Sequence, residues 1–239
     1  TDTDNQYRAV MCLGLTTDTQ DSSGTILARH EAAASQEEVR RAILSFVGRY
    51  DQIPPMYSAL KVGGQKLCDL ARQGKTVERK PRPVEIYRIE IHRLELPRVE
   101  MTVSCSKGTY IRTLCHDIGQ ALGCGAVLEK LVRIRAGIFY VEDSLTLGQV
   151  ERLRDEGALE RHVLPIEEVF RALPVYRCCP SQGKALQNGN ALNAGGLGQE
   201  AGEYRVQDPQ GRFVGVYTYC PGEKLLRPKK LFFIGGGPL

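Results

Sequence analysis

The spacing of apolar residues predicts a strand, a hairpin and a helix at the start of the chain. Residues 7–13 alternate between apolar and more polar positions, as in a strand with one face toward a core. A turn at residues 18–24 and a return at residues 25–29 predict that this strand is part of a hairpin. Ser35-Gln-Glu-Glu38 has the pattern of a capping box, and apolar residues at helical spacing follow it until a glycine.

Strands and helices also mix through the middle of the chain. Residues 65–73 predict a short helix, and residues 84–96 and 98–106 alternate as two strands. Residues 109–122 place their apolar side chains on one helical stripe, and residues 145–153 predict a last helix. Because no regular βαβ period is present, the fold class is α+β, with a mostly antiparallel mixed sheet and flanking helices.

From about residue 165 the pattern changes to short strand signals separated by turns. The turns are marked by Asn188-Gly189, Pro209-Gln-Gly211 and Pro221-Gly222. We therefore predict two domains, residues 1–165 and residues 166–239. The second is small and β-rich, a size at which an independent core is marginal, so we expect it to dock on the first.

Composition is that of a soluble, cytoplasmic protein. Hydrophobic residues make up 42% and charged residues 25%, and no apolar run approaches the roughly 20 residues needed to span a bilayer. The eight cysteines are dilute in a chain of this length and form neither CxxC pairs nor His-spaced metal patterns. We expect reduced core cysteines and no metal site.

The net charge of +4 does not by itself indicate a polyanionic partner, but its distribution is informative. Residues 72–98 hold eight basic side chains against four acidic ones, and Lys224, Arg227, Lys229 and Lys230 form a second group near the C-terminus. Such groups can neutralise phosphates. On charge alone, a solvated basic surface explains them equally well.

Three stretches carry a resemblance to a known family. They are Ile53-Pro-Pro-Met-Tyr-Ser-Ala-Leu-Lys61 with Gly64-Gln-Lys-Leu, Cys105-Ser-Lys-Gly-Thr-Tyr-Ile-Arg-Thr113 leading into Asp117-Ile-Gly119, and Leu131-Val-Arg133 with Gly137. In these stretches the chain resembles TruB-type tRNA pseudouridine synthases from Tyr7 to about Thr146. The remainder is similar, more loosely, to the PUA-like RNA-binding domain of that family. The two longer motifs each fix eight or more positions in order, so they are specific.

The resemblance implies an enzyme that isomerises a uridine in the T-loop of tRNA, without metal or cofactor. The reaction breaks the glycosidic bond, turns the base and rejoins it through carbon, so the base must first leave its stack. The family attributes this work to one aspartate, and a guanidinium is a suitable partner for such a carboxylate. Arg112 matches the family's arginine. Without the match, Arg112 is better explained as a surface arginine.

Four further residues match family positions. Tyr7 matches the active-site tyrosine that packs on the flipped base, and Tyr110 and Leu131 match residues that line the base pocket. Each of these three would otherwise be ordinary packing material. Lys61 is a candidate contact to RNA or to the pocket, and on charge alone a solvated lysine is as good an explanation.

The chain departs from the family upstream of Tyr7, where the family carries a Gly-Thr-Leu-Asp-Pro-type loop with its catalytic aspartate. No such loop occurs here, and Asp18 and Asp21 fall in the predicted turn, so we assign none of them the nucleophile's role. Two interpretations stay open: a fragment of a longer enzyme, or a non-catalytic RNA-binding or tRNA-folding module. In either case we expect this chain alone to be inactive. We also expect the missing segment or another chain to cover an exposed sheet edge.

Overall fold

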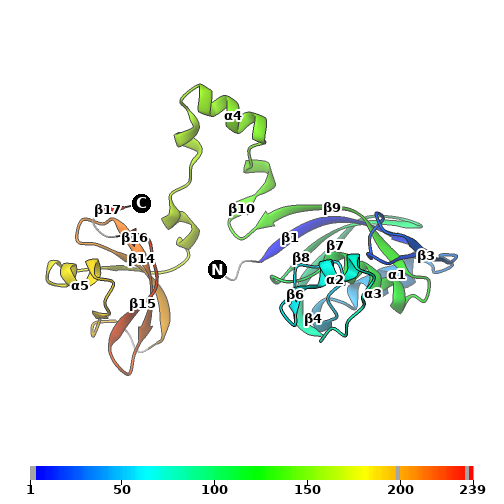
Figure 1. The fold of residues 1–239 in the computed structure, drawn as a ribbon, viewed down its shortest axis with the longest axis horizontal. Helices are drawn as coiled ribbons and strands as arrows, with labels where there is room; N and C mark the ends of the chain where they lie inside the picture. The colour runs from blue at the N-terminus through cyan, green and yellow to red at the C-terminus, as the bar shows by residue number, and fades with distance from the viewer. Residues whose placement is uncertain (1–3, 198–199, 235–236, 239) are drawn as a thin grey trace. The chain divides into compact units, whose positions relative to one another are not determined.

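The computed structural model describes residues 4–197, 200–234 and 237–238, and its chain divides into two compact units, Thr1–Leu145 and Thr146–Leu239 (Figure 1). The predicted domain boundary at residue 165 stays a prediction; the sheet of the second unit begins further along, at Val175. Among the residues that the structure describes, no helix is long and apolar enough to cross a membrane.

The first unit is organised by a six-stranded sheet in the order β10-β9-β1-β8-β7-β4. Every pairing in it is antiparallel, so the predicted α+β class is confirmed. The long strand β1 lies in the middle, between β8 and β9, and β10 and β4 form the edges. In sheet order the strands are Phe139–Tyr140, Ala126–Ala136, Asn5–Leu13, Arg98–Cys105, Arg82–Glu95 and Gly48–Gln52.

The predicted hairpin of residues 7–13 and 25–29 is wrong. Strand β3 (Ile26–Arg29) pairs with β2 (Leu15–Thr17) and not with β1. The reason lies at Gly14, whose φ of +82° turns the chain out of β1, and whose N–H donates to the carbonyl of Gly125 at 2.9 Å. Beyond this kink only the short β2 is free to pair with β3.

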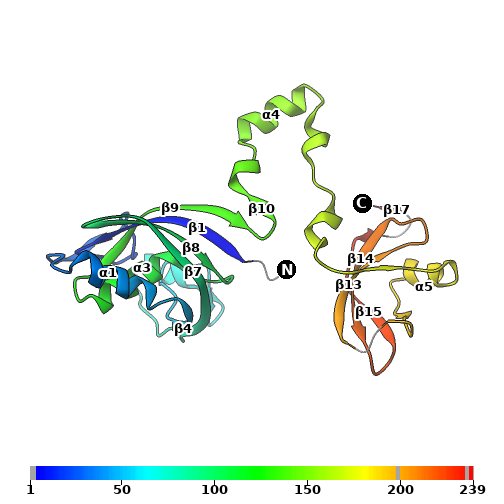
Figure 2. The same cartoon turned by 180° about the vertical axis from the view of Figure 1, so that it is seen from behind.

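Two helices cover one face of the sheet, as Figure 2 shows for α1 and α3. Helix α1 (Gln36–Leu44) begins at the predicted capping box, in which Ser35 and Glu38 bond reciprocally. Helix α3 (Ile111–Ala121) presses so closely on β9 that a Cβ at Gly119 would meet the backbone nitrogen of Ala126 at 2.1 Å. Their buried stripes close the core with residues of the strands: Tyr7, Ala9, Met11, Val39, Ile43, Val99, Met101, Val103, Leu114 and Ile118.

A small lobe projects from this unit between β4 and β7. It holds the hairpin of β5 (Lys61–Val62) and β6 (Gln65–Lys66), followed by the short helix α2 (Leu67–Arg72). The helix predicted at residues 65–73 therefore begins only at Leu67, because Gln65 and Lys66 form β6. The segment before the hairpin, residues 53–60, carries the first family motif and connects the lobe to the sheet.

The second unit begins with helix α4 (Leu147–Asp155) and two 3-10 turns, Leu159–His162 and Ile166–Phe170. A five-stranded sheet follows in the order β11-β13-β14-β15-β12, with the short helix α5 (Gly183–Gln187). The ring of Phe170 contacts those of Phe213 and Phe232, which ties the second 3-10 turn to the sheet. The strands of the unit, in chain order, are Val175–Arg177, Leu192–Asn193, Gly202–Gln207, Phe213–Cys220, Leu225–Leu231, Phe233–Ile234 and Gly237–Pro238.

Candidate functional site

A pocket of about 430 Å³ opens in the first unit where β1, β9 and the start of α3 meet. Four of the five site residues predicted from the sequence line it: Tyr7, Tyr110, Arg112 and Leu131. They come from three separate segments of the chain, which the sheet and α3 bring together. We call this the reaction pocket. Its walls also include Asp21 and Arg133, which the sequence did not indicate as site residues.

The start of α3 is held in place by a side chain from a different strand. Gly108 has a φ of +81°, and Thr109 donates its hydroxyl to the carbonyl of Ser106, so the chain turns sharply before Tyr110. No side chain of the helix caps its first turn. Instead Gln52, at the end of β4 and 1% exposed, accepts from the Tyr110 N–H at 2.8 Å and donates to its carbonyl at 3.1 Å.

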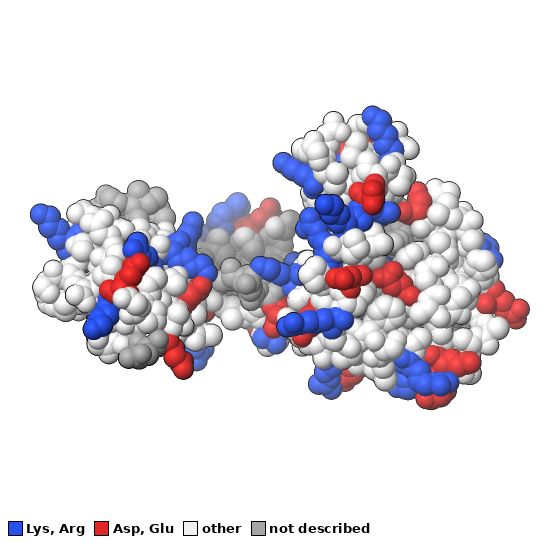
Figure 3. All heavy atoms as spheres, turned by 90° about the horizontal axis from the view of Figure 1, so that it is seen from below, with Lys and Arg blue, Asp and Glu red and all other residues white. Residues whose placement is uncertain are grey.

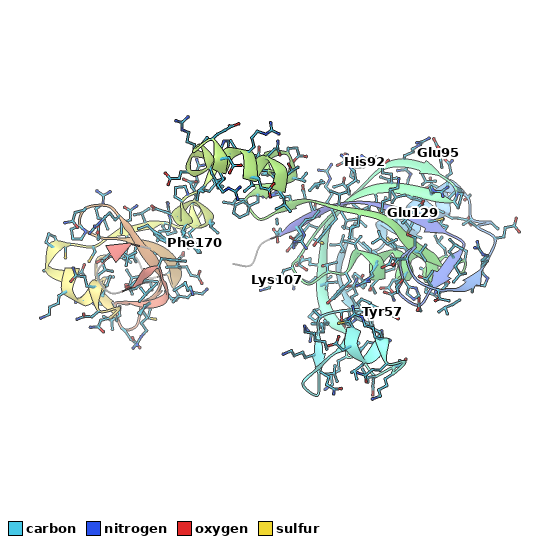
Figure 4. The ribbon with its side chains drawn as sticks, turned by 45° about the horizontal axis from the view of Figure 1, so that its top comes forward. Tyr57, His92, Glu95, Lys107, Glu129 and Phe170 are labelled. Carbon is cyan, nitrogen blue, oxygen red and sulfur yellow. The ribbon has the colours of Figure 1, made fainter. Side chains whose placement is uncertain are left out.

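Arg112 therefore lies in the first turn of α3, where its guanidinium is fixed on two sides. Its Nη1 donates to Oδ2 of Asp21 at 3.1 Å, and both side chains are about three-quarters buried, at 24% and 23% exposure. Its Nη2 donates to the carbonyl of Tyr57. Figure 4 labels Tyr57 where the projecting lobe joins the sheet. The guanidinium thus links α3, the loop at residues 18–24 and the first family motif.

Asp21, which the sequence placed in a turn and for which it gave no role in catalysis, is the carboxylate partner of Arg112. Its loop is fastened to β9, because Asp21 forms an isolated bridge with Leu128 and Ser22 donates to the Leu128 carbonyl at 2.9 Å. Partial burial by itself raises the pKa of Asp21. Hydrogen bonds from Ser23 and Thr19 and the charge of Arg112 outweigh that effect and hold the pKa below its usual value. Asp21 is therefore an ionised partner of Arg112.

Tyr7 lies beneath a second arginine. The Arg133 Nε donates to the Tyr7 hydroxyl oxygen at 3.1 Å, and its guanidinium carbon lies 5.3 Å from the centre of the ring. The register of β1 and β9 explains the contact, because Tyr7 and Arg133 are direct partners. The tyrosine is 8% exposed, so only part of its ring faces the reaction pocket.

Apolar side chains complete the reaction pocket. Leu128 and Ile111 are buried beneath it, whereas Leu131 is 44% exposed at its opening. A cavity with aromatic and aliphatic walls and a fixed Asp–Arg pair suits a flat, polar ring, which stacks on the walls and accepts hydrogen bonds at its edge.

Lys61 is the one predicted site residue that does not line the reaction pocket. It lies on β5, in the projecting lobe, and borders a different cavity together with Arg79, Lys80 and Arg82. The structure therefore brings four of the predicted residues together and sets the fifth apart. The sequence held no specific signal for Asp21, because residues 16–23 have the Thr, Ser and Asp content of an ordinary turn.

Comparison with known proteins gives a consistent result along the chain. Residues 1–111 match the TruB family pseudouridylate synthase (N terminal domain), and residues 112–171 match the tRNA pseudouridylate synthase B C-terminal domain. The tRNA pseudouridine synthase B of Dechloromonas aromatica (strain RCB) is 41% identical over 96% of this chain and 75% of its own length. That of Stutzerimonas stutzeri (strain A1501) is 42% identical over 90% of this chain and 71% of its own length.

A solved structure has the same fold at lower identity. A chain from the crystal structure of a Cbf5-Nop10-Gar1 complex superposes with a TM-score of 0.68 and is 22% identical, covering 96% of this chain and 67% of that one. At this identity the similarity shows the fold alone.

Proposed function

Since this chain belongs to the TruB family of pseudouridylate synthases, we propose that the protein isomerises a uridine in the T-loop of tRNA to pseudouridine. The observation that carries the proposal is the convergence of Tyr7, Tyr110, Leu131 and the Asp21–Arg112 pair on one pocket of about 430 Å³. Relatives that are about two-fifths identical over most of the chain are named tRNA pseudouridine synthase B, which supports tRNA as the substrate.

The residues of the reaction pocket divide the work between stacking and charge. The uridine must leave its stack to enter the pocket, and the rings of Tyr7 and Tyr110 replace the lost stacking, worth roughly 1–3 kcal/mol for each base. The Arg112 guanidinium orients a carboxylate or stabilises charge that develops on the detached base. Asp21 holds Arg112 in its rotamer, so we assign Asp21 a positioning role.

We further propose that these 239 residues bind tRNA but do not isomerise it by themselves. Among the residues that the structure describes, Asp21 is the one carboxylate that lines the reaction pocket. Its two oxygens are already engaged by Arg112, Ser23 and Thr19. This observation keeps the non-catalytic RNA-binding or tRNA-folding module as a second candidate function.

The remaining proposals concern partners and location. The β-rich sheet of the second unit acts as a PUA-like RNA-binding domain, because β15 carries the C-terminal basic residues Arg227, Lys229 and Lys230. The cysteines are free thiols throughout the described chain, which fits a reducing cytoplasm. A further segment or chain covers an edge of the six-stranded sheet, at β10 or β4.

Tritium release tests the function, because forming the carbon–carbon bond at C5 of uracil displaces the hydrogen there. Three proteins are compared on tRNA labelled with [5-³H]uridine: this chain, a chimera that places before it the residues N-terminal to the matched region of the Dechloromonas aromatica relative, and the chimera with Arg112→Ala. We expect release from the chimera, background release from the chain, and a loss of at least about a hundredfold with Arg112→Ala.

The outcomes separate the two candidate functions. A chimera that binds tRNA but releases no tritium supports the binding module and overturns the enzyme. Release by the chain alone shows that the nucleophile lies within these residues; Asp21→Asn then identifies it.

A further inference from the structure

The side chain of Arg133 lines the reaction pocket beside Tyr7 and stands outside the pair of Asp21 and Arg112. Its Nε donates to the Tyr7 hydroxyl oxygen at 3.1 Å, and its side chain makes no other hydrogen bond in the described chain. Figure 3 shows basic and acidic side chains close together at several places on one face of the molecule. No carboxylate pairs with Arg133 among the described residues, so this guanidinium is committed to the tyrosine.

The pairing of β9 with β1 explains why Arg133 reaches the hydroxyl. Arg133 is opposite Tyr7 and Arg135 is opposite Gln6, so Ile134 is an extra residue in β9 at this point. A bulge of this kind redirects side chains, and bulges are frequent beside active sites. Because neighbouring residues of β1 point to opposite faces, the bulge sends Arg133 to the face of Tyr7 and Arg135 to the face of Gln6.

The hydrogen bond from Arg133 determines where the Tyr7 proton points. A guanidinium has N–H donors and no acceptor, so the Tyr7 oxygen has to accept in this bond. The hydroxyl proton therefore points away from Arg133, and no group in the part of the chain that the structure describes accepts it. Since Tyr7 is otherwise buried and lines the reaction pocket, the pocket is where an acceptor can reach this proton.

We propose that Arg133 is a positioning residue that acts through Tyr7. It holds the hydroxyl with its proton toward the bound base, and its charge stabilises the phenolate while that proton is away. This inference rests on the proposed function. The guanidinium carbon lies 5.3 Å from the centre of the Tyr7 ring, and an arginine keeps its charge in proteins, so the stabilising charge is present throughout the reaction.

Isomerisation contains two proton transfers in which such a tyrosine can take part. Once C5 of uracil has bonded to the ribose carbon, N1 must gain a proton and C5 must lose one. The Tyr7 hydroxyl gives its proton to N1, directly or through one water molecule, and becomes a phenolate. The phenolate then takes the proton from C5, which restores the hydroxyl and leaves the electron pair of the C5–H bond in the ring. Arg133 itself transfers no proton.

A contact to an RNA phosphate is the competing role for Arg133. A phosphate contact would contribute to the affinity for tRNA and make that affinity depend on salt. A role through Tyr7 instead contributes after tRNA has bound, so it affects kcat and leaves affinity unchanged. Separate measurements of kcat and Kd therefore distinguish the two roles.

Both quantities are measured on the chimera described above, because tritium release from C5 reports the second proton transfer directly. Arg133→Gln should lower kcat roughly tenfold to a hundredfold, the effect of losing one charge-assisted hydrogen bond, and should change the Kd for tRNA by less than about twofold. Arg133→Lys keeps the charge and should regain roughly threefold or more of the lost kcat. An unchanged kcat, or a loss that appears in Kd alone, would overturn the proposal.

Arg135 provides a matched control on the same strand. Its guanidinium carbon lies 5.2 Å from the centre of the Tyr140 ring and its Nε donates to the Gly137 carbonyl, but it does not line the reaction pocket. Arg135→Gln should change kcat by less than about twofold. A loss of kcat equal to that of Arg133→Gln would show that either arginine merely supports the strand, and the proposal would fail.

A double variant tests whether Arg133 acts through the hydroxyl. Tyr7→Phe keeps the ring and removes the oxygen that Arg133 holds, so adding Arg133→Gln to it should lower the single-turnover rate no further. If the two losses multiply, Arg133 acts independently of the Tyr7 hydroxyl and the proposal is wrong. If Tyr7→Phe alone leaves no measurable rate, the separation of kcat from Kd in Arg133→Gln decides.

The contact can also be tested without turnover, on the complete 239-residue chain. Urea denaturation of Tyr7→Phe, Arg133→Gln and the double variant should show losses of stability that are not additive, because each single change removes the same hydrogen bond. An inactive chimera together with this coupling shows that the proposed function fails although Arg133 holds Tyr7. An active chimera with additive losses rejects the role of Arg133 and retains the isomerase.

Discussion

Two arginines of the first unit are held in opposite ways. Arg112 donates to Asp21 and to the Tyr57 carbonyl, so its charge is balanced within the unit and its orientation is fixed. Arg79 donates to the carbonyl of Pro54, but among the described residues its Nε has no hydrogen-bond partner and no carboxylate pairs with it. A paired guanidinium is an oriented part of a site, whereas an unpaired one attracts an anion from outside. Substitutions near the reaction pocket should therefore change stability, and substitutions of free cations should change salt-dependent affinity.

The largest effect on stability should come from Gln52. Gln52→Ala removes both hydrogen bonds to the Tyr110 backbone and leaves a small cavity at a residue that is 1% exposed. The Tyr110 N–H loses its acceptor, whereas the Tyr110 carbonyl keeps the Leu114 N–H as a donor. The unmade hydrogen bond and the cavity together should lower the free energy of unfolding by about 3 kcal/mol. Urea denaturation measures it. Gln65→Ala, on the exposed hairpin of the lobe, is the control and should change it by less than about 0.5 kcal/mol. Equal effects would show that Gln52 does not hold α3.

A smaller loss should follow Asp21→Ala, which leaves the Arg112 charge partly buried and without its carboxylate. We expect the free energy of unfolding to fall by about 2 kcal/mol at neutral pH. This is less than for a fully buried ion pair, because both side chains are about a quarter exposed. The control is Glu90→Ala in the surface pair with Arg88, where about 0.5 kcal/mol or less is expected.

The Asp21 effect should depend on pH in a defined direction. Because the folded-state pKa lies below the usual 3.8, the ionised carboxylate stabilises the fold at pH values above 3.8. That stabilisation is lost as the pH falls through the folded-state pKa. The difference between wild type and Asp21→Ala should shrink under acidic conditions, and a constant difference down to strong acid would refute an ionised pair.

Asp117, which lies on α3 with Arg112, has a pKa shifted in the opposite direction from that of Asp21. Burial raises its pKa to about 6, and it has no hydrogen-bond partner in the described chain. The folded state therefore binds the proton more tightly than the unfolded state, and the carboxylate destabilises the fold as the pH rises from the usual 3.8 through about 6. After allowance for its partial exposure, Asp117→Asn should stabilise the chain by about 1 kcal/mol at pH 7.

The gain should fade at acidic pH, where both side chains are neutral. Thermal unfolding at several pH values tests this, with the exposed Asp51→Asn as control. If Asp117→Asn destabilises the chain at pH 7, then its carboxylate makes a contact that offsets its burial.

The sequence predicted which segments carry the residues of the reaction pocket better than it predicted the hydrogen bonds between those segments. Motifs with many fixed positions identified Tyr110 and Arg112, and the family match is confirmed. Gln52 and Asp21 could not be found in this way, because their roles depend on neighbours more than fifty residues away: Gln52 reaches Tyr110, and Asp21 reaches Arg112. Such contacts follow from strand register and from the packing of α3, which periodicity along one element does not contain.

The hairpin shows the same limit on a smaller scale. Alternation correctly marked the strand at residues 7–13, but alternation does not say which strand is its partner. Gly14, a single residue in the left-handed region, turns the chain away after β1. The two edges of β1 therefore pair with strands that are distant in the sequence, β8 and β9.

Salt dependence provides the finest test of the difference between paired and free cations. If RNA binding by this chain neutralises about four phosphates, log affinity should fall against log salt with a slope of roughly −0.7 × 4, or about −3. The C-terminal basic group contains a matched pair on β15, in which Lys229 pairs with Glu203 and Lys230 has no ion pair in the described chain.

A lysine that already has a carboxylate partner neutralises an RNA phosphate less completely, so fewer counterions leave the RNA. Lys230→Ala should therefore flatten the slope by about 0.7, and Lys229→Ala by clearly less. Tyr110→Ala serves as the opposite control: it should weaken binding at every salt concentration and leave the slope unchanged, because stacking releases no ions. Filter binding across a salt series measures all three. Equal flattening by the two lysine variants would mean that the Glu203 pair opens when RNA binds, and a slope near zero for the unaltered chain would remove phosphate contact as the basis of binding.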